Sequence, residues 1–216
     1  MIEAVIWDFG GVLTSSPFEA FARFEAEHGL PPDIIRRTNT ENHHDNAWAK
    51  FERAEIDLDA FDDLFAAESR ALGAEVRGRD VLPLLKGDLR PDMVAALRMI
   101  GGHFKTGCIT NNLPANSMGS ASGRTLYVAE VMALFDHIIE SAKIGLRKPD
   151  PRIYHMMIER LHVDPKNCVY LDDLGVNLKP ARDMGMTTIK VLTAEQGIAD
   201  LERATGLSLR IGATVP

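Results

Sequence analysis

Six polar side chains lie where chemistry on a phosphate group could be done. Each follows, or lies shortly beyond, a short apolar run typical of a β-strand; they are Asp8, Thr110, Asn111, Lys148, Asp172 and Asp173. In a parallel sheet, ligands bind beyond the carboxyl ends of the strands. If these runs form one parallel sheet, a single site could therefore gather all six side chains.

The three acidic side chains of this set predict a magnesium site. Asp8, Asp172 and Asp173 would repel one another unless a divalent cation lay between them, and ligands that are all oxygen favour Mg²⁺. With the cation neutralising both the carboxylate and the phosphate, Asp8 could attack phosphorus and form an aspartyl-phosphate. An acidic pair can also simply end a strand or cap a helix, but three carboxylates in matching strand contexts favour the metal.

The other three side chains are suited to holding phosphate. Thr110 and the backbone N–H of Asn111 could bind equatorial oxygens, and Lys148 could offset the charge that develops. The alternative for Thr110 is a buried hydroxyl satisfied by the backbone. Arg147 adjoins Lys148, but Pro149 fixes the local turn and favours Lys148 as the inward residue.

Strand-like and helical segments alternate along most of the sequence. Strands are expected at residues 2–7, 106–110, 137–140, 168–171 and 187–191, with helices near 126–134, from 151 onward and near 178–184. This alternation predicts an α/β fold, with a Rossmann-like parallel sheet that carries helices on both faces.

Helix ends are marked by residues with a specific capping chemistry. Asp150 can cap a helix whose first residue is Pro151. Thr193 and Gln196 can form a capping box at the start of the last helix. The glycines that suit left-handed helix ends are Gly185 and Gly206.

A helical insert interrupts the alternation between residue 14 and about residue 87. Apolar residues recur there at helical spacing, as in Phe61, Leu64, Phe65 and Leu72. We therefore predict a core domain of residues 1–14 and 88–216 and a helical cap domain of residues 15–87, inserted after the first strand. Three phenylalanines are expected to pack within the insert rather than line a pocket: Phe18, Phe21 and Phe24. The loop 114–124, rich in Asn, Ser and Gly, is expected to be mobile.

Composition narrows the class of protein. A formal charge of −7 and a pI near 5.5 argue against nucleic acid as a partner. The apolar run 2–7 is too short for a signal sequence, and no run approaches a membrane span, so a cytoplasmic protein is expected. Cys108 and Cys168 lie in buried, strand-like runs, where reduced and inert thiols are expected.

Four motifs in order along the chain resemble those of the haloacid dehalogenase (HAD) superfamily of hydrolases. They are Asp8-Phe9-Gly10-Gly11-Val12-Leu13, Thr110-Asn111-Asn112, Lys148-Pro149-Asp150-Pro151 with Ile153-Tyr154, and Leu171-Asp172-Asp173-Leu174-Gly175 with Asn177-Leu178-Lys179. Within the superfamily, the chain is similar to the phosphatase-like domain at the N-terminus of soluble epoxide hydrolases and of some acyl-CoA dehydrogenase family members.

The resemblance implies a role for each motif residue. Asp8 would be the nucleophile and a metal ligand, and the backbone carbonyl of Gly10 a second ligand. Asp173 would bind the metal directly and Asp172 would support it, with Asn177 steadying the acidic loop. The three residues that would bind phosphate are Thr110, Asn111 and Lys148. The insert corresponds to the family's helical cap.

One position departs from the family pattern. Phosphatases of the family usually carry Asp where this chain has Gly10, and that Asp protonates the leaving oxygen and later activates water. A positioned general acid or base contributes about 10² to 10⁴ in rate. The sequence therefore predicts weak turnover with metal and phosphate binding retained. His43 or His44 could supply the missing proton, or the two could belong to a zinc site. We favour a third interpretation over both, in which the two histidines lie at a solvated helix start.

Two other functions remain open beside a Mg²⁺-dependent phosphatase that acts on a small phosphorylated metabolite. One is a catalytically silent phosphometabolite binder that kept the metal site. The other is carbon–halogen hydrolysis by Asp8, which the acidic pair disfavours because neighbouring carboxylates without a cation would raise the pKa of Asp8 and blunt it as a nucleophile. The sequence predicts neither the substrate nor the oligomeric state.

Overall fold

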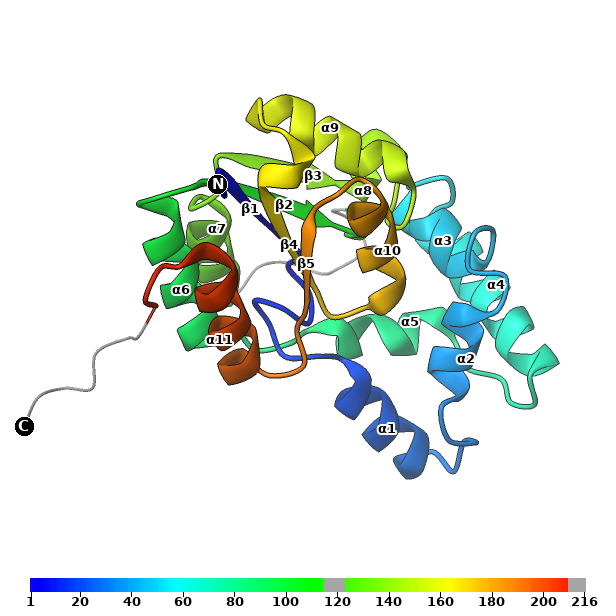
Figure 1. The fold of residues 1–216 in the computed structure, drawn as a ribbon. Helices are drawn as coiled ribbons and strands as arrows, with labels where there is room; N and C mark the ends of the chain where they lie inside the picture. The colour runs from blue at the N-terminus through cyan, green and yellow to red at the C-terminus, as the bar shows by residue number, and fades with distance from the viewer. Residues whose placement is uncertain (115–122, 210–216) are drawn as a thin grey trace, which may run out of the picture.

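A parallel sheet forms the centre of the protein, whose computed structural model describes residues 1–114 and 123–209. Within these residues the sheet has five strands in the order β3-β2-β1-β4-β5 (Figure 1). The strands are β1 (Ala4–Trp7), β2 (Lys105–Thr110), β3 (His137–Glu140), β4 (Cys168–Asp172) and β5 (Thr187–Lys190). All neighbouring strands pair in parallel, which confirms the predicted α/β, Rossmann-like class. Asp172 ends β4 instead of following it.

Helices cover both faces of the sheet. They are α6 (Pro91–Gly101), α7 (Gly123–Met132), α8 (Ser141–Ile144), α9 (Pro151–Leu161), α10 (Gly175–Asp183) and α11 (Ala194–Thr205). Val5 and Trp7 face the cluster that α6 and α11 complete, whereas Ala4 and Ile6 face the cluster that α9 and α10 complete. Because side chains alternate along a strand, the wholly apolar β1 is buried on both faces, as a central parallel strand requires.

The predicted helix ends are largely confirmed. The Asp150 side chain accepts a hydrogen bond from the Arg152 N–H at 2.9 Å, at the start of α9. Thr193 caps α11 by accepting from the Gln196 N–H at 3.2 Å, but Gln196 Oε1 accepts from the Leu192 N–H, so only half of the capping box forms. The left-handed glycines have φ values of +95° at Gly185 and +73° at Gly206.

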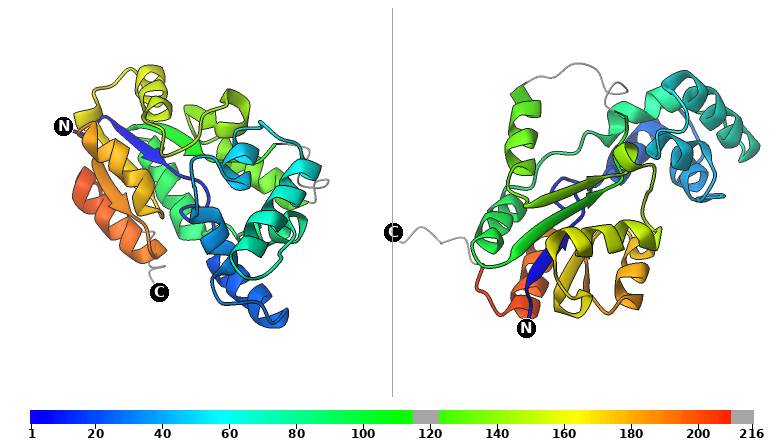
Figure 2. Two further views of the ribbon diagram at one scale, coloured as in Figure 1. Left: turned by 90° about the vertical axis from the view of Figure 1, so that its right-hand side faces the viewer. Right: turned by 90° about the horizontal axis from the view of Figure 1, so that it is seen from above.

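Residues 15–87 contain helices that group beyond the carboxyl ends of the strands (Figure 2). They are α1 (Phe18–Glu27), α2 (Ile34–Thr40), α3 (Ala47–Glu52), α4 (Leu58–Ala71) and α5 (Gly78–Val81), followed by a 3-10 helix at Leu82–Leu85. These helices enclose their own apolar cluster, in which Phe21 is buried and Phe18 and Phe24 are partly buried, as expected. Leu64, which lies on the apolar spacing of this segment, has an exposed side chain.

The two connections between the helical segment and the sheet lie side by side. The Ser15 N–H donates to the Asp88 carbonyl at 2.7 Å, and the Arg90 N–H donates to the Leu13 carbonyl at 2.8 Å. Thr14 and Leu89 form an antiparallel bridge between these two hydrogen bonds. The segment therefore leaves and re-enters the core next to the loop that follows β1. The division into two domains stays a prediction.

Three smaller predictions have different outcomes. Most of the loop 114–124 lies outside the described residues. Cys108 and Cys168 are free and buried, and burial raises the pKa of both thiols, that of Cys168 to about 12, as expected for unreactive groups. Across the described ranges, the chain contains no helix that combines the length and apolarity needed to cross a bilayer.

Candidate active site

The structure brings the predicted acidic side chains and Lys148 into one buried cluster. The Lys148 ammonium lies 2.8 Å from Asp8 Oδ1 and 2.8 Å from Asp172 Oδ2. Lys148 and Asp172 are 1% and 0% exposed, and Asp8 is 7% exposed. One carboxylate oxygen from each of Asp8, Asp172 and Asp173 lies within 4.8 Å of the others. The cluster therefore holds acidic oxygens at the spacing that a shared cation needs.

Strand register explains why residues from distant parts of the chain meet here. Trp7 of β1 pairs with Leu171 of β4, so the residues that follow them, Asp8 and Asp172, emerge together at the carboxyl edge. The Asp8 N–H continues this pairing by donating to the Leu171 carbonyl at 2.8 Å. The Phe9 N–H donates to Asp8 Oδ1 at 2.6 Å. The nucleophile candidate is thus fixed by the sheet and by the first peptide of its own loop.

Asp8, Asp172, Asp173 and Lys148 carry a formal charge of −2, because three carboxylates face one ammonium. Burial, reinforced by the other two carboxylates and opposed by Lys148, raises the pKa of Asp8 well above its usual value. Burial and Asp172 raise the pKa of Asp173 to about 6. Burial alone would lower the pKa of Lys148, but Asp172 and Asp8 outweigh it and raise that pKa. The excess negative charge matches a divalent cation.

Asp172 is saturated by donors from the protein. Its Oδ2 accepts from Lys148 at 2.8 Å and from the Tyr170 hydroxyl at 2.6 Å, and its Oδ1 accepts from the Leu174 N–H at 2.8 Å. The Asn177 amide donates to both oxygens, at 3.1 and 3.2 Å, which fits its expected role beside the acidic loop. Asp172 is therefore suited to holding Lys148 rather than to direct contact with a metal.

Tyr170 was not singled out from the sequence. Its signal was present, because a tyrosine in an otherwise apolar, buried strand needs a hydrogen-bond partner for its hydroxyl. Burial and the neighbouring Asp172 raise the pKa of Tyr170, so the phenol stays a proton donor to that carboxylate. A second tyrosine, Tyr154, supports the same network by donating to the Asn177 carbonyl at 2.7 Å.

The two phosphate-binding candidates after β2 behave differently. Thr110 is only partly buried, and its hydroxyl makes no hydrogen bond to any residue that the structure describes, so the alternative of a satisfied buried hydroxyl does not hold. The Asn111 side chain is already engaged with Lys148: its Oδ1 accepts from the Lys148 N–H at 2.8 Å and its Nδ2 donates to the Lys148 carbonyl at 3.1 Å. Asn111 could therefore offer phosphate only its backbone N–H.

The two glycines after Asp8 occupy different surroundings. Gly11 has φ +74°, and a Cβ added there would lie 2.2 Å from Asp173 Oδ2. Both the left-handed backbone conformation and the close approach of Asp173 therefore require glycine at position 11. In the sequence, the pair Gly10-Gly11 was the only sign of this requirement. A Cβ added at Gly10 would meet nothing within 4 Å. The space around this Cβ position therefore does not require glycine where family phosphatases carry Asp.

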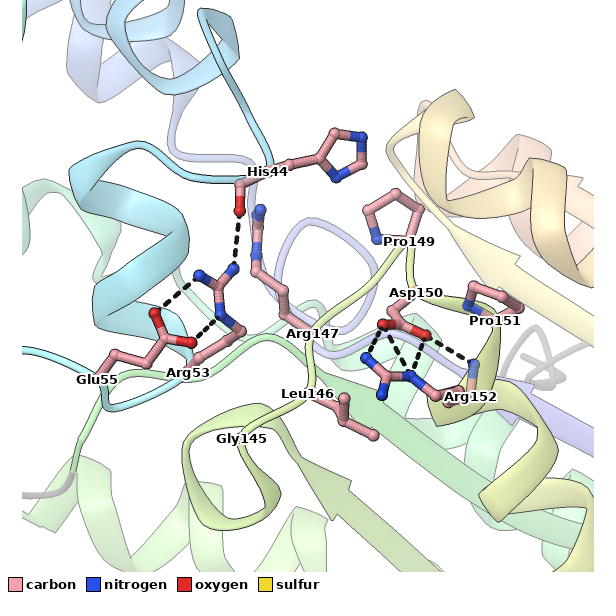
Figure 3. A pocket seen from close by; sticks show the side chains of 10 residues that line it. All are labelled: His44, Arg53, Glu55, Gly145, Leu146, Arg147, Pro149, Asp150, Pro151 and Arg152. Atoms are coloured by element: carbon pink, nitrogen blue, oxygen red, sulfur yellow. Dashed lines mark hydrogen bonds and ion pairs between the residues drawn. The ribbon is translucent and has the colours of Figure 1, made fainter.

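His43 and His44 lie in the turn before α3, and their rings are 3.9 Å apart. Burial is the main cause that lowers the pKa of His43. Within residues 1–114 and 123–209, neither imidazole hydrogen-bonds to Asp8. His44 instead lines a cavity of about 410 Å³ between the helical segment and residues 145–152 (Figure 3). A role for either histidine as a replacement acid stays a prediction.

Comparison with known proteins places the chain in a family. A family model for haloacid dehalogenase-like hydrolases matches residues 2–185. Bifunctional epoxide hydrolase 2 of Sus scrofa is 30% identical over 96% of this chain, and acyl-CoA dehydrogenase family member 10 of Mus musculus is 31% identical over 97%. The chain spans only 40% and 20% of the lengths of these two relatives.

Two further matches cover most of this chain and most of the matched protein. Phosphatase MT3486 of Mycobacterium tuberculosis (strain CDC 1551 / Oshkosh) is 29% identical over 86% of this chain and 85% of its own length. A HAD family enzyme of Bacteroides thetaiotaomicron, solved in complex with magnesium and inorganic phosphate, shares the fold with a TM-score of 0.61 at 18% identity, over 93% of this chain and 99% of that one. The family match over residues 2–185 and the shared fold show that the chain belongs to the haloacid dehalogenase-like hydrolases.

Proposed function

We propose that the protein hydrolyses a small phosphate ester in a Mg²⁺-dependent reaction that passes through an aspartyl-phosphate on Asp8. The observation that carries the proposal is the buried cluster in which Lys148 bridges Asp8 and Asp172 while Asp173 stands beside them. The mycobacterial relative that is named a phosphatase supports the reaction class. The Bacteroides neighbour in complex with magnesium and phosphate supports the ligands.

The residues present fit a magnesium ion. Asp8, Asp173 and the Gly10 carbonyl would hold it, because Asp172 has no oxygen left to offer. Burial is the main cause of the raised pKa values of Asp8 and Asp173, and neighbouring carboxylates add to it; a bound cation would offset both effects. When bound, the ion supplies charge neutralisation and polarises the phosphoryl group.

The chain's own residues divide the remaining work. An Asp8 oxygen forms a bond to phosphorus as the bond from phosphorus to the ester oxygen breaks, and water later cleaves the resulting acyl-phosphate to release inorganic phosphate. Lys148, the Thr110 hydroxyl and the Asn111 N–H would hold the phosphoryl oxygens. Gly10 can neither give the leaving oxygen a proton nor activate the water, so the leaving oxygen takes its proton from solvent.

Turnover should therefore depend strongly on the leaving group. An aryl phosphate releases a stable phenolate without help, whereas an alkyl phosphate needs a proton. We expect faster hydrolysis of aryl phosphates, with an initial burst of phenol release because breakdown of the acyl-phosphate limits their turnover. For alkyl phosphates, transfer of the phosphoryl group to Asp8 should be the slow step. Equal rates for both classes without a burst would contradict this expectation.

The helical segment is proposed to act as a cap domain, with residues 15–87 covering a core of residues 1–14 and 88–216. Its helices lie beyond the carboxyl ends of the strands, on the same side as the carboxylate cluster (Figure 2). A separate apolar cluster within the segment supports its treatment as a unit. Specificity for a small phosphorylated metabolite would arise from this segment.

Two alternatives make different predictions in the same experiment. The test is release of inorganic phosphate from para-nitrophenyl phosphate at high enzyme concentration, with Mg²⁺ and with EDTA, beside an Asp8→Asn control. Mg²⁺-dependent release that Asp8→Asn abolishes supports the proposal. A silent binder would take up Mg²⁺ and phosphate without release. A dehalogenase would instead liberate halide from a 2-haloacid, with or without Mg²⁺.

A further inference from the structure

One ion pair connects the helical segment to the loop that carries Lys148. Arg147 Nε donates to Glu52 Oε2 at 2.6 Å, and Arg147 Nη1 donates to the His43 carbonyl at 2.7 Å. Both partners belong to the helical segment, whereas Arg147 belongs to the loop after α8. The side chains of Arg147 and Glu52 are 17% and 8% exposed. This contact is thus largely removed from water, unlike most surface ion pairs.

The Glu52 side chain that pairs with Arg147 is itself held in place by a second hydrogen bond. Its second oxygen, Oε1, accepts from the Trp48 Nε1–H at 2.9 Å, so both carboxylate oxygens are engaged. Trp48 packs edge-on against Phe61 at 5.6 Å and lies 6.1 Å from Phe65, within the apolar cluster of the segment. The Arg147 guanidinium is therefore linked to the interior of the helical segment and not to a loose surface side chain.

The residue next to Arg147 is the ammonium donor of the candidate active site. The Lys148 backbone is held by the Asn111 amide on both its N–H and its carbonyl, and its side chain reaches Asp8 and Asp172. A single peptide unit thus separates the anchor on the helical segment from the residue that contacts the nucleophile. Movement of Glu52 away from Arg147 would release the restraint that the helical segment places on this loop.

We infer that Arg147 is a positioning residue, which holds Lys148 in place for the reaction only while the helical segment is seated against the core. This inference rests on the proposed function, because it assigns the position of Lys148 to that chemistry. Removing one partner would leave the other charge buried without compensation, which penalises the closed arrangement more than loss of an exposed pair would.

Arg147 lines the cavity between the helical segment and residues 145–152, and two other arginines that line it offer matched controls (Figure 3). Among the described residues, the hydrogen bonds of each of these two arginines stay within one part of the chain. Arg53 donates to Glu55 and to the His44 carbonyl, all within the helical segment. Arg152 donates to Asp150, both at the start of α9. An Arg53→Gln variant therefore removes a guanidinium from the same cavity without removing either partner of the Arg147–Glu52 ion pair.

The test compares Arg147→Gln, Glu52→Gln, their double variant and Arg53→Gln, each as the full chain with Mg²⁺. Steady-state hydrolysis of para-nitrophenyl phosphate should show kcat lowered about tenfold in both single variants, with a smaller change in KM. The double variant should lose no more than either single one, because both changes break one link. Arg147→Lys should restore only part of the rate, since an ammonium lacks the planar fork that reaches Glu52 and His43 together. Arg53→Gln should match the wild type.

Hydrogen exchange gives a readout that needs no turnover. Amides of residues 145–148 and 150 should exchange faster in Arg147→Gln and Glu52→Gln than in the wild type or Arg53→Gln. Additive kinetic losses, an equal loss in Arg53→Gln, or unchanged exchange at these amides would each overturn the inference. A wild type without Mg²⁺-dependent hydrolysis would overturn the proposed function instead, and the exchange result would still decide whether Arg147 orders the Lys148 loop.

Discussion

Replacing Gly10 by Asp should raise the rate of hydrolysis, because it supplies the acid and base function that glycine lacks. A Cβ at this position meets nothing within 4 Å, and Gly10 is not among the positive-φ glycines, so neither the first side-chain atom nor the backbone conformation opposes the substitution. Its carboxyl group would supply a proton to the leaving oxygen and later activate water. That contribution is worth about 10² to 10⁴ in rate, or about 3 to 5 kcal/mol of barrier.

Two assays separate the two roles of the new carboxyl group. In single-turnover reactions with Mg²⁺, Gly10→Asp should accelerate alcohol release from an alkyl phosphate by about 10² to 10⁴, and from para-nitrophenyl phosphate far less, because nitrophenolate leaves unprotonated. In multiple turnovers, the burst predicted for the wild type with the aryl ester should disappear in Gly10→Asp, since breakdown of the acyl-phosphate is no longer slow.

Gly10→Asn is the matched control, because its amide fills similar space without acid or base function. The reasoning is refuted if Gly10→Asn accelerates the alkyl ester as much as Gly10→Asp does. It is also refuted if Gly10→Asp gives the same factor for both esters in a single turnover.

Three further perturbations probe the carboxylate cluster. Gly11→Ala should abolish Mg²⁺ binding in calorimetry, because the new methyl group would occupy the place of Asp173 Oδ2; binding at wild-type affinity would disprove the close approach. Lys148→Met should lower the free energy of unfolding in urea by about 3 to 5 kcal/mol, since Asp8 and Asp172 lose their buried counter-charge; a loss within experimental error would count against the buried pair. The pKa of Asp173, raised to about 6, makes the metal-free protein less stable as pH rises through about 6, whereas Mg²⁺ needs the ionised form. The increase in Tm that Mg²⁺ causes should therefore grow from about pH 5 to about pH 7.5, and a pH-independent increase would contradict this.

The sheet could be predicted from the sequence because its strands are buried on both faces. β1 and β4 are almost wholly apolar, and the polar residues at their ends mark the carboxyl edge. Asp8 and Asp172 meet there because the pairing of Trp7 with Leu171 fixes the register. Helix starts could also be predicted, because the Asp150 side chain caps the helix that begins at Pro151 through a local hydrogen bond that needs no tertiary contact.

What the sequence did not reveal depends on contacts between distant segments. The hydrogen bond between Asn111 and Lys148 joins residues 37 positions apart in the sequence, and the ion pair between Glu52 and Arg147 joins residues 95 positions apart. Periodicity carries no information about such pairs. Periodicity also does not determine burial, because a position on the apolar spacing of a helix, such as Leu64, is buried only where another element covers it.

The most direct test of the account is titration calorimetry of Mg²⁺ into the wild type and into Asp173→Asn at about pH 7.5. Because three carboxylates share a pocket with one ammonium, we predict one site in the wild type and a large loss of affinity in the variant. No heat of binding in the wild type, or equal affinity in both proteins, would contradict the claim that these side chains form a cation site.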